Sequence, residues 1–315
     1  MRSKLILATR GSPLALAQAE LVKNEMERQW SGLGVELLKI KTSGDLILDR
    51  PLRTVGGKGL FVKEIEEALL QGMADFAVHS MKDIPSELPE GLKIGVILKR
   101  EDPADVLLSQ KHASLSQLPR GAIVGTSSLR RKIQLQLLRP DLKVKDLRGN
   151  VDTRIRKMRE GQFDAVILAL AGLRRLGKGS EAGERLPFIC APGQGAIGIE
   201  FKKDDVELEK LLSVLHDELT AQCVKAERII LRNLEGGCEL PVGAQAGLAD
   251  EKLHLKAFIA NPDGTKFIED EVAGDLELAE DLGEKLTEIL MKKGAGEILE
   301  EIRSHLPLPR GRGPG

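Results

Sequence analysis

Short apolar runs alternate with amphipathic stretches along the first two thirds of the chain. Residues 4–8 and 35–41 have the length and apolar content of buried strands, and the stretch from Leu14 to about Trp30 has the spacing of a helix. Ser12 and Pro13 stand where the N-cap and the first turn of that helix are expected. This alternation of strands and helices predicts mostly parallel, doubly wound sheets.

The same order of elements occurs twice. The pattern predicts a helix at 61–70 and a strand at 74–79, then strands at 122–125, 143–147 and 163–169 with helices at 126–138 and 152–160. In both passages a helix ends at a glycine, Gly72 or Gly161, shortly before a strand that begins with Asp and contains Ala-Val, DFAV at 75–78 and DAV at 164–166. This similarity predicts two α/β domains of one architecture, formed by residues 1–99 with about 196–215 and by residues 100–195.

The pattern changes from about Leu219. An amphipathic helix at 219–232 would place Leu219, Cys223, Ala226 and Ile230 on one apolar face. Strands are expected near 242–248, 253–260 and 267–272, with a turn at 261–264 (NPDG), followed by a helix at 276–293 that ends at Gly294. Residues 216–315 are therefore expected to form a small α+β domain, which completes an α/β fold of two doubly wound domains and a C-terminal domain.

Composition narrows the kind of ligand. The 315 residues carry a net charge of −1, aromatic residues make up only 3%, and tyrosine is absent, so neither nucleic-acid binding nor membrane binding is indicated. No apolar run approaches the roughly 18 residues of a membrane span, and no signal peptide is visible. We expect a cytoplasmic protein with a small-molecule substrate. Three scattered cysteines and five histidines without ligand spacing predict no disulfide framework and no metal site.

Positive charge is concentrated in one part of the chain. Between Arg120 and Arg175 there are ten arginines, four lysines and five acids, a net charge of +9. Because a guanidinium binds two oxygens of a carboxylate or phosphate at once, this patch favours a small ligand with several negative charges. A solvated helix face explains residues 154–159 equally well, but it explains Arg130, Arg131 and Arg148 less well, since these lie at predicted element boundaries.

The loops at the carboxyl ends of the predicted strands hold the candidate chemistry, because ligands of such sheets bind there. These loops are Thr9–Ser12, Ser80–Pro85, Thr126–Arg131 and Ala171–Arg175. They contain Asp83 and much of the arginine. As an alternative to a functional role, Asp83 fits a turn or cap acid before Ile84 and Pro85.

A cysteine in a glycine loop is the second candidate. Cys238 follows Gly236 and Gly237 in the run LEGGCELPVG, and such a loop leaves a thiol open to alkylation. The alternative is a buried, inert cysteine. Nucleotide binding is not indicated, because GGKG at 56–59 lacks the P-loop spacing and no GxGxxG follows the first strand. GQGAIG at 193–198 is interpreted as a hinge or strand entry.

Seven runs distributed over almost the whole chain resemble the porphobilinogen deaminase family, whose members are also called hydroxymethylbilane synthases. They are ATRGSPLA at 8–15, VGGKGLFVKE at 55–64, AVHSMKDIP at 77–85, GTSSLRR at 125–131, LRGNVDTR at 147–154, AGLRRL at 171–176 and LEGGC at 234–238.

The resemblance implies a monomeric transferase of tetrapyrrole biosynthesis, with two domains similar to type II periplasmic binding proteins and a third domain that carries the cofactor cysteine. It implies a dipyrromethane cofactor joined to Cys238 by a thioether. Four porphobilinogen molecules would be added head to tail, each with loss of ammonia, and hydrolysis would release hydroxymethylbilane.

The matched runs also assign residues. Asp83 would be catalytic, and the cofactor would be held by Lys82, Thr126, Ser127, Ser128, Arg130, Arg131, Arg148 and Arg154. The substrate would be met by Arg10, Ser12, Lys58 and Arg175. The family often has a lysine immediately before VGGKG, where this chain has Thr54, and Arg53 is the nearby residue that can replace that charge.

Two other functions fit part of the pattern. A non-catalytic small-anion binding module would use the first two domains alone, but it predicts an export signal or a DNA-binding segment and leaves Cys238 unexplained. A phosphate-binding transferase would also use arginines and helix N-termini, and it predicts that replacing Cys238 has no effect.

Overall fold

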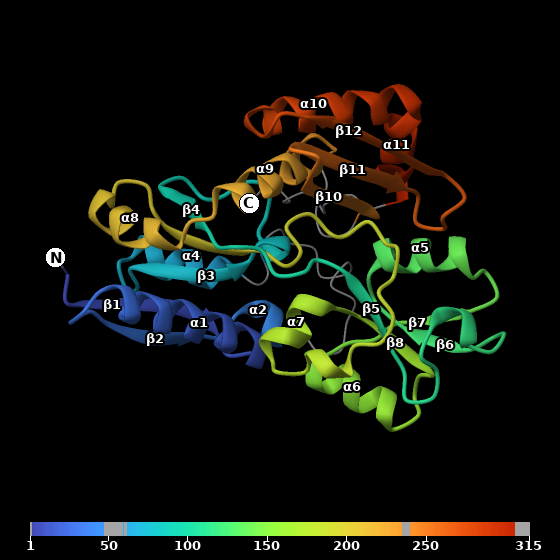
Figure 1. The fold of residues 1–315 in the computed structure, drawn as a ribbon, viewed down its shortest axis with the longest axis horizontal. Coiled ribbons are helices and arrows are strands. Elements are labelled where there is room, and N and C mark those ends of the chain that lie inside the picture. Colours follow the sequence, from blue (N-terminus) through green and yellow to red (C-terminus); the bar gives the residue numbers. More distant parts are fainter. Residues whose placement is uncertain (1, 47–58, 60–61, 235–239, 306–315) are drawn as a thin grey trace, which may run out of the picture.

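Three sheets, each with its own helices, form three lobes of the molecule (Figure 1). The computed structural model describes residues 2–46, 59, 62–234 and 240–305. The first lobe is blue to cyan with a later yellow segment, the second is green, and the third is orange to red.

The first sheet has the strand order β2-β1-β3-β9-β4. β1 is parallel to β2 and β3, whereas β9 is antiparallel to both of its neighbours. The strands are β1 (Lys4–Arg10), β2 (Gly34–Ile40), β3 (Phe76–Ser80), β4 (Leu92–Ile97) and β9 (Ile197–Lys202), and the helices are α1 (Pro13–Gln29), α2 (Ser43–Leu46), α4 (Lys63–Leu70) and α8 (Val206–Leu212). As expected, Ser12 caps α1, since its Oγ accepts a hydrogen bond from the Ala15 N–H at 3.3 Å.

Each face of this sheet buries an apolar layer. Phe76, Val78 and Ile199 pack on one face with residues of α1 and α8, and Ala8 and Ala77 pack on the other with Ile65 and Leu69 of α4. This two-sided burial explains why the strands are almost continuously apolar.

The second sheet has the order β5-β8-β6-β7, in which β6 is parallel to β7 and β8, and β5 is an antiparallel edge strand. The strands are β5 (Asp105–Leu108), β6 (Ile123–Gly125), β7 (Lys143–Lys145) and β8 (Ala165–Ala169), and the helices are α5 (Leu129–Leu138), α6 (Val151–Arg159) and α7 (Leu170–Arg175). Two separate apolar clusters cover its two faces.

The third lobe is an antiparallel sheet of β10 (Val242–Ala249), β11 (Lys252–Ala260) and β12 (Phe267–Gly274), covered by α9 (Glu218–Asn233), α10 (Ala279–Leu290) and α11 (Gly296–His305). Short helical turns occupy Met81–Asp83, Leu115–Gln117, Gly179–Glu181, Ser213–Leu215, Leu276–Leu278 and Met291–Ala295. None of the helices in the described part of the chain combines the length and the apolar character that crossing a membrane requires.

Several details of the pattern were predicted wrongly. Most strands of the two larger sheets run parallel, as expected, but one strand in each, β9 and β5, runs against its neighbours, which the pattern did not predict. Leu219 is 39% exposed, although Cys223, Ala226 and Ile230 are buried as expected. The last helix does not end at Gly294: this glycine has a φ of 105° at a kink, and the chain continues as α11.

Two chain segments run between the first and second lobes, the first at Arg100 and Glu101 and the second at residues 190–195. They are joined to each other by hydrogen bonds. The Glu101 N–H donates to the Gly195 carbonyl at 3.2 Å, and Arg100 Nε donates to the Gln194 carbonyl at 2.8 Å. Gly195 has a φ of 88°, and a Cβ there would overlap the Glu101 carbonyl oxygen. The crossing therefore depends on close contact between two backbones.

The third lobe joins the other two at this crossing. Glu227 of α9 is completely buried, and its carboxylate binds Arg100 Nη1 at 2.6 Å. It also accepts hydrogen bonds from the Gly193 N–H at 2.6 Å and the Ala246 N–H at 2.7 Å. One side chain thus links α9 and β10 to both crossing segments.

Candidate active site

A pocket lies at the carboxyl edge of the first sheet. Its lining includes Arg10 and Ser12 after β1, Gln18 of α1, and His79, Ser80 and Asp83 at the end of β3 and in the following turn. Asp83 is exposed, and the Gln18 side chain donates a hydrogen bond to Ser80 Oγ at 2.8 Å. Three residues that the sequence assigns to the site, Arg10, Ser12 and Asp83, are therefore brought together.

Three hydroxyl residues shape the turn between β6 and α5. Thr126 is buried, and its Oγ1 accepts a hydrogen bond from the Ser128 N–H at 3.2 Å. Ser127 Oγ donates to the Leu147 carbonyl at 2.9 Å and accepts from the Leu147 N–H at 3.0 Å. Ser128 caps α5 through the Arg131 N–H at 3.5 Å. These bonds position the start of α5, from which the arginines extend.

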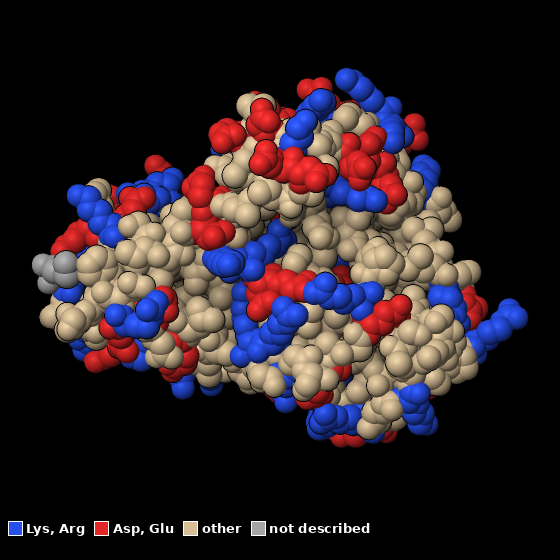
Figure 2. All heavy atoms as spheres, in the orientation of Figure 1, with Lys and Arg blue, Asp and Glu red and all other residues tan. Residues whose placement is uncertain are grey.

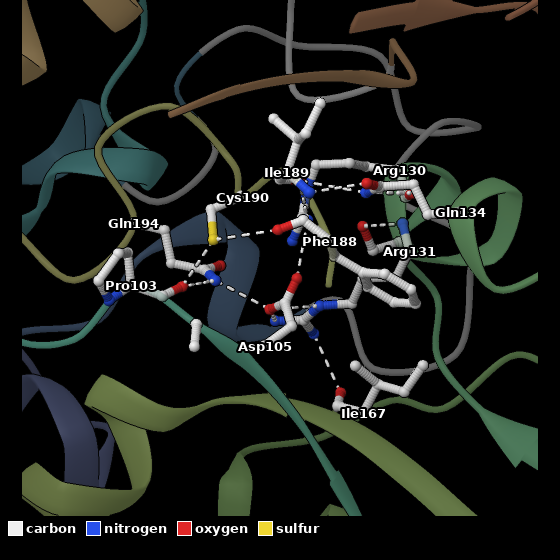
Figure 3. A network of polar contacts seen from close by, with 12 residues as sticks. Pro103, Asp105, Arg130, Arg131, Gln134, Ile167, Phe188, Ile189, Cys190 and Gln194 are labelled. Atoms are coloured by element: carbon white, nitrogen blue, oxygen red, sulfur yellow. Dashed lines mark hydrogen bonds and ion pairs between the residues drawn. The ribbon is translucent and has the colours of Figure 1, made fainter. Parts of the chain in front are cut away.

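Arg130 and Arg131 are both buried and share one carboxylate, that of Asp105 (Figure 3). Arg130 Nη1 lies 2.7 Å from Asp105 Oδ2, and Arg131 Nη2 lies 2.7 Å from Oδ1. The guanidiniums also donate to the carbonyls of Ile189 and Ile167 at 2.7 and 3.0 Å. Together they hold the pKa of Asp105 well below its usual range, although burial alone would raise it. The cluster therefore carries one unbalanced positive charge.

Further cations face the same region. Burial lowers the pKa of Lys82 to about 8; the charges of Arg131 and Arg130 also lower it, while Asp83 acts in the opposite direction. Burial lowers the pKa of Arg154 to about 10, with Arg131 adding to the effect and Asp83 opposing it. The lysine and aspartate after β3 thus lie within electrostatic range of arginines from the second lobe.

Arg154 is half-buried rather than part of a solvated helix face, and its Nε donates to the Gly149 carbonyl at 2.8 Å. Its neighbours Arg156 and Arg159 do match the solvated interpretation, since they are exposed and pair with Glu160 and Glu181. Arg148, whose charge also lowers the pKa of Arg154, is half-buried beside it.

Arg175 lies at the lobe crossing. Its Nη2 donates to the Gly195 carbonyl at 2.6 Å, and burial lowers its pKa to about 10. Cys238, Lys58, Arg53 and Thr54 lie outside the described residues. The chain that follows the Cys238 loop is described: β10 contacts the second crossing segment through a hydrogen bond from the Ala244 N–H to the Cys190 carbonyl at 3.0 Å.

Sequence reasoning missed Asp105, Glu227 and His79. The only local signal for Asp105 is an acid at the start of the apolar run DVLL, where an unpaired charge would be costly. On the face drawn in Figure 2, Lys and Arg are interleaved with Asp and Glu, so no continuous basic surface covers it. The cations of the second lobe that bear on the site are buried or half-buried ones.

The strand ends of the two α/β lobes thus bring buried and half-buried cations close to one exposed carboxylate, that of Asp83. Two family models match the chain: "Porphobilinogen deaminase, dipyromethane cofactor binding domain" at residues 5–210 and "Porphobilinogen deaminase, C-terminal domain" at residues 221–292. The chain belongs to the porphobilinogen deaminase family.

Curated relatives of this chain are also porphobilinogen deaminases. A porphobilinogen deaminase of Maridesulfovibrio salexigens is 52% identical over 95% of this chain and 98% of its own length. One of Nitratidesulfovibrio vulgaris is 53% identical over 95% of this chain and 97% of its own length. These matches confirm the expectation of a transferase of tetrapyrrole biosynthesis with a dipyrromethane cofactor, and they do not favour a non-catalytic anion-binding module.

Solved structures of binding proteins are more distantly similar. The methionine binding protein MetQ has 15% identity and a TM-score of 0.43, and covers 68% of this chain and 89% of its own. A nutrient binding protein from Burkholderia cenocepacia bound to methionine has 16% identity and a TM-score of 0.41, and covers 66% of this chain and 89% of its own.

Proposed function

We propose that this chain condenses four porphobilinogen molecules head to tail with loss of ammonia and then releases hydroxymethylbilane by hydrolysis. The observation that carries the proposal is the proximity of Lys82, Arg130, Arg131 and Arg154 to one another and to two carboxylates, Asp83 and Asp105. Their cationic charge exceeds that of the two carboxylates within range, Asp83 and Asp105. The imbalance fits a cofactor whose pyrrole rings carry carboxylates, because each carboxylate offers a guanidinium two oxygens.

The residues that would hold the cofactor carboxylates are Lys82, Thr126, Ser127, Ser128, Arg130, Arg131, Arg148 and Arg154, with Cys238 forming the covalent thioether. When bound, the dipyrromethane supplies a nucleophilic pyrrole carbon to which the first substrate unit is joined. Arg130 and Arg131 keep donor hydrogens beyond those used by Asp105 and the carbonyls of Ile167 and Ile189, so each can also bind the ligand.

Asp83 is the proposed catalytic carboxylate. It is exposed in a pocket that also contains Arg10 and Ser12. Loss of ammonia from the substrate leaves positive charge on the methylene carbon, and a fixed carboxylate stabilises that charge and accepts hydrogen bonds from pyrrole N–H groups. Arg10, Ser12, Lys58 and Arg175 would bind the carboxylates of the incoming unit and of the lengthening product.

We also propose domain bounds of 1–99 with about 196–215, 100–195 and 216–315. The membership of β9 and α8 in the first lobe supports the return of the chain after residue 195. The finer assignments of a monomer and a cytoplasmic location are part of this proposal, and so is the absence of a nucleic-acid partner. The last of these is supported by the near-neutral charge and by the lack of a continuous basic surface on the face in Figure 2.

The intact denatured mass of the purified protein tests the proposal. The wild type is expected to exceed its sequence mass by two linked pyrrole units, and Cys238→Ser to lack this excess. Cys223→Ala is the matched control: Cys223 is buried in the core of the third lobe, so this variant keeps the excess. A bare wild type that stays bare after incubation with porphobilinogen contradicts the proposal.

A further inference from the structure

Three titratable side chains meet beneath the pocket on one face of the first sheet. His79 of β3 and Glu200 of β9 form a contact of 2.9 Å between Nε2 and Oε2, and their side chains are 4% and 0% exposed. The strand register pairs His79 with Gly198, so Glu200 lies two residues further along β9 on the same face of the sheet. Glu66 of α4, the helix that covers this face, is 7% exposed.

The cluster lacks a balancing cation. In the described part of the chain no Lys or Arg pairs with Glu66 or Glu200, and Oε1 of each is buried without a hydrogen-bond partner. Two bare carboxylates in such a place would be costly, so protons must be shared among the three groups. Burial, then the charges of Glu200 and Glu67, raise the pKa of Glu66 to about 7. Near neutral pH Glu66 can therefore take up and release a proton.

His79 connects this buried cluster to the reaction site. Its residue lines the same pocket as Asp83, Arg10 and Ser12. Among the described polar residues that line the pocket, Asp83 and His79 carry side chains that can act as proton acceptors. Asp83 is needed as an anion beside the developing cation. An imidazole held by a buried carboxylate is the arrangement that fixes a general base.

Each condensation requires such a base. The C–N bond of the substrate's aminomethyl group breaks and its electron pair leaves with ammonia; a C–C bond forms between the methylene carbon and a pyrrole α-carbon. That α-carbon must then give up its proton, so that the C–H electron pair returns to the ring. The released proton needs an acceptor inside the pocket.

We propose that His79, oriented by Glu200, accepts this α-carbon proton and that Glu66 and Glu200 form the buried store through which the charge is balanced. The inference rests on the proposed function. The proton later leaves to solvent or to the released ammonia, which becomes ammonium, so each cycle returns His79 to its initial state.

The elements packed against β3 carry further charged groups. Arg10 ends β1, Glu200 lies on β9, Lys82 and Asp83 follow β3, and α4 carries Glu64 and Glu67 beside Glu66. From β4, Lys93 lies over the ring of Phe201, on the opposite face of the sheet. A change in the pH profile of elongation in a His79 variant must therefore be compared with the profile of a control variant in which all of these groups are kept.

The test uses porphobilinogen carrying deuterium at its free pyrrole α-carbon. In His79→Gln the chain-elongation rate is expected to fall by about 100-fold, and the deuterium isotope effect on elongation to rise above that of the wild type. The ladder of intact masses, which counts added pyrrole units, reports elongation separately from cofactor loading. Loading of His79→Gln is expected to equal that of the wild type.

Glu200→Gln is the second variant and keeps both the ring and the side-chain shape. It is expected to change the isotope effect in the same direction. A readout without turnover is the 15N resonance of the His79 ring, whose titration should shift in Glu200→Gln. His216→Gln is the matched control, because His216 forms a half-exposed pair with Glu218 at 3.3 Å, away from the pocket.

The outcomes separate the two proposals. If the wild type carries no cofactor and adds no pyrrole units, the proposed function itself fails. If the wild type elongates normally and both His79→Gln and Glu200→Gln keep its isotope effect and pH profile, the inference about His79 is overturned while the function stands. If His79→Gln does not fold, Glu200→Gln and the ring titration decide.

Discussion

At the scale of single residues, Asp105 sets how much positive charge the site presents. It is completely buried, and Arg130 and Arg131 lie on its two oxygens. Gln194 Nε2 donates a further hydrogen bond to Oδ1 at 2.8 Å. Two buried guanidiniums without this carboxylate would be unstable, and two carboxylates would leave nothing for a ligand. One aspartate for two arginines therefore lets the site be both folded and cationic.

Asp83→Asn tests the catalytic carboxylate. The exposed Asp83 makes no ion pair in the described residues, so the variant should fold and should keep its cofactor. Turnover should fall by about 100-fold or more, because the neutral amide no longer stabilises the cation. Intact mass and the rate of product formation measure the two properties. Near-normal turnover would remove Asp83 from the mechanism. Asp204→Asn, an exposed acid between β9 and α8, serves as control.

Lys82 predicts an alkaline limit to cofactor assembly. Burial lowers its pKa to about 8 from an ordinary 10.5, so the empty site loses this charge as the pH rises through 8. Because the unfolded chain then binds more protons, this group makes the stability of the empty protein rise with pH between about 8 and 10.5. The affinity for a carboxylate ligand changes with pH in the opposite direction, because it falls as Lys82 loses its positive charge above pH 8.

Loading of the apoprotein with dipyrromethane should therefore slow above pH 8, which mass spectrometry at several pH values can follow. In Lys82→Arg the side chain stays charged, and this limb of the profile should disappear. A profile that is the same in both proteins would show that Lys82 does not bind the ligand's charge.

At the scale of helices and strands, local signals determined how well the sequence predicted the fold. The Ser12 cap and Pro13 mark the start of α1, and the apolar runs mark β1, β6 and β8, because these signals lie within a few residues. β5 was missed because it begins with a charged residue, Asp105, and only three apolar residues follow. β4 was missed because Gly95 interrupts its apolar run, and a Cβ there would overlap the ring of Phe201 on β9.

The candidate site shows the same difference between features with a local sequence signal and features without one. Sequence patterns identified the strand-end loops that hold Asp83, Arg130 and Arg131, since parallel strands bring their carboxyl ends to one edge. They could not identify Asp105 or Glu227 as partners. Arg131 is 26 positions from Asp105, and Arg100 is 127 positions from Glu227. Such pairs are fixed only by tertiary packing, which no local periodicity records.

Gly195→Ala tests the close approach of the two crossing segments. The positive φ and the contact with the Glu101 carbonyl both oppose a Cβ, so we expect a loss of about 2–3 kcal/mol in the free energy of unfolding. Denaturant unfolding measures it. Gly247→Ala on β10 is the control, because a Cβ there meets nothing within 4 Å. Equal stabilities for the two variants would contradict the tight crossing.

At the scale of the whole molecule, one buried ion pair connects the three lobes. Arg100 lies where the chain leaves the first lobe, and Glu227 lies on α9, which leads to the Cys238 loop. The Glu227 carboxylate also receives the Gly193 and Ala246 N–H groups. The position of the third lobe is thus tied to the crossing between the other two.

Glu227→Gln should loosen this connection. The amide keeps the shape of the side chain, but its single oxygen cannot serve Arg100 and two backbone N–H groups together, which leaves a buried charge poorly paired. We expect a loss of about 2–4 kcal/mol in the free energy of unfolding. We also expect slower cofactor loading, because the lobe that carries the cysteine is no longer held against the arginines. Denaturant unfolding and the time course of intact mass measure the two effects.

Glu280→Gln provides the comparison for this last prediction. Glu280 of α10 pairs at 2.7 Å with Lys225, which lies on α9 as Glu227 does, but this pair is exposed. Stability and loading should both stay at wild-type values, since an exposed pair is screened by water. If Glu227→Gln lost stability but loaded at the wild-type rate, the buried pair would stabilise the fold without positioning the cofactor lobe. If neither property changed, the link between the third lobe and the crossing would have to lie in the apolar contacts around β10.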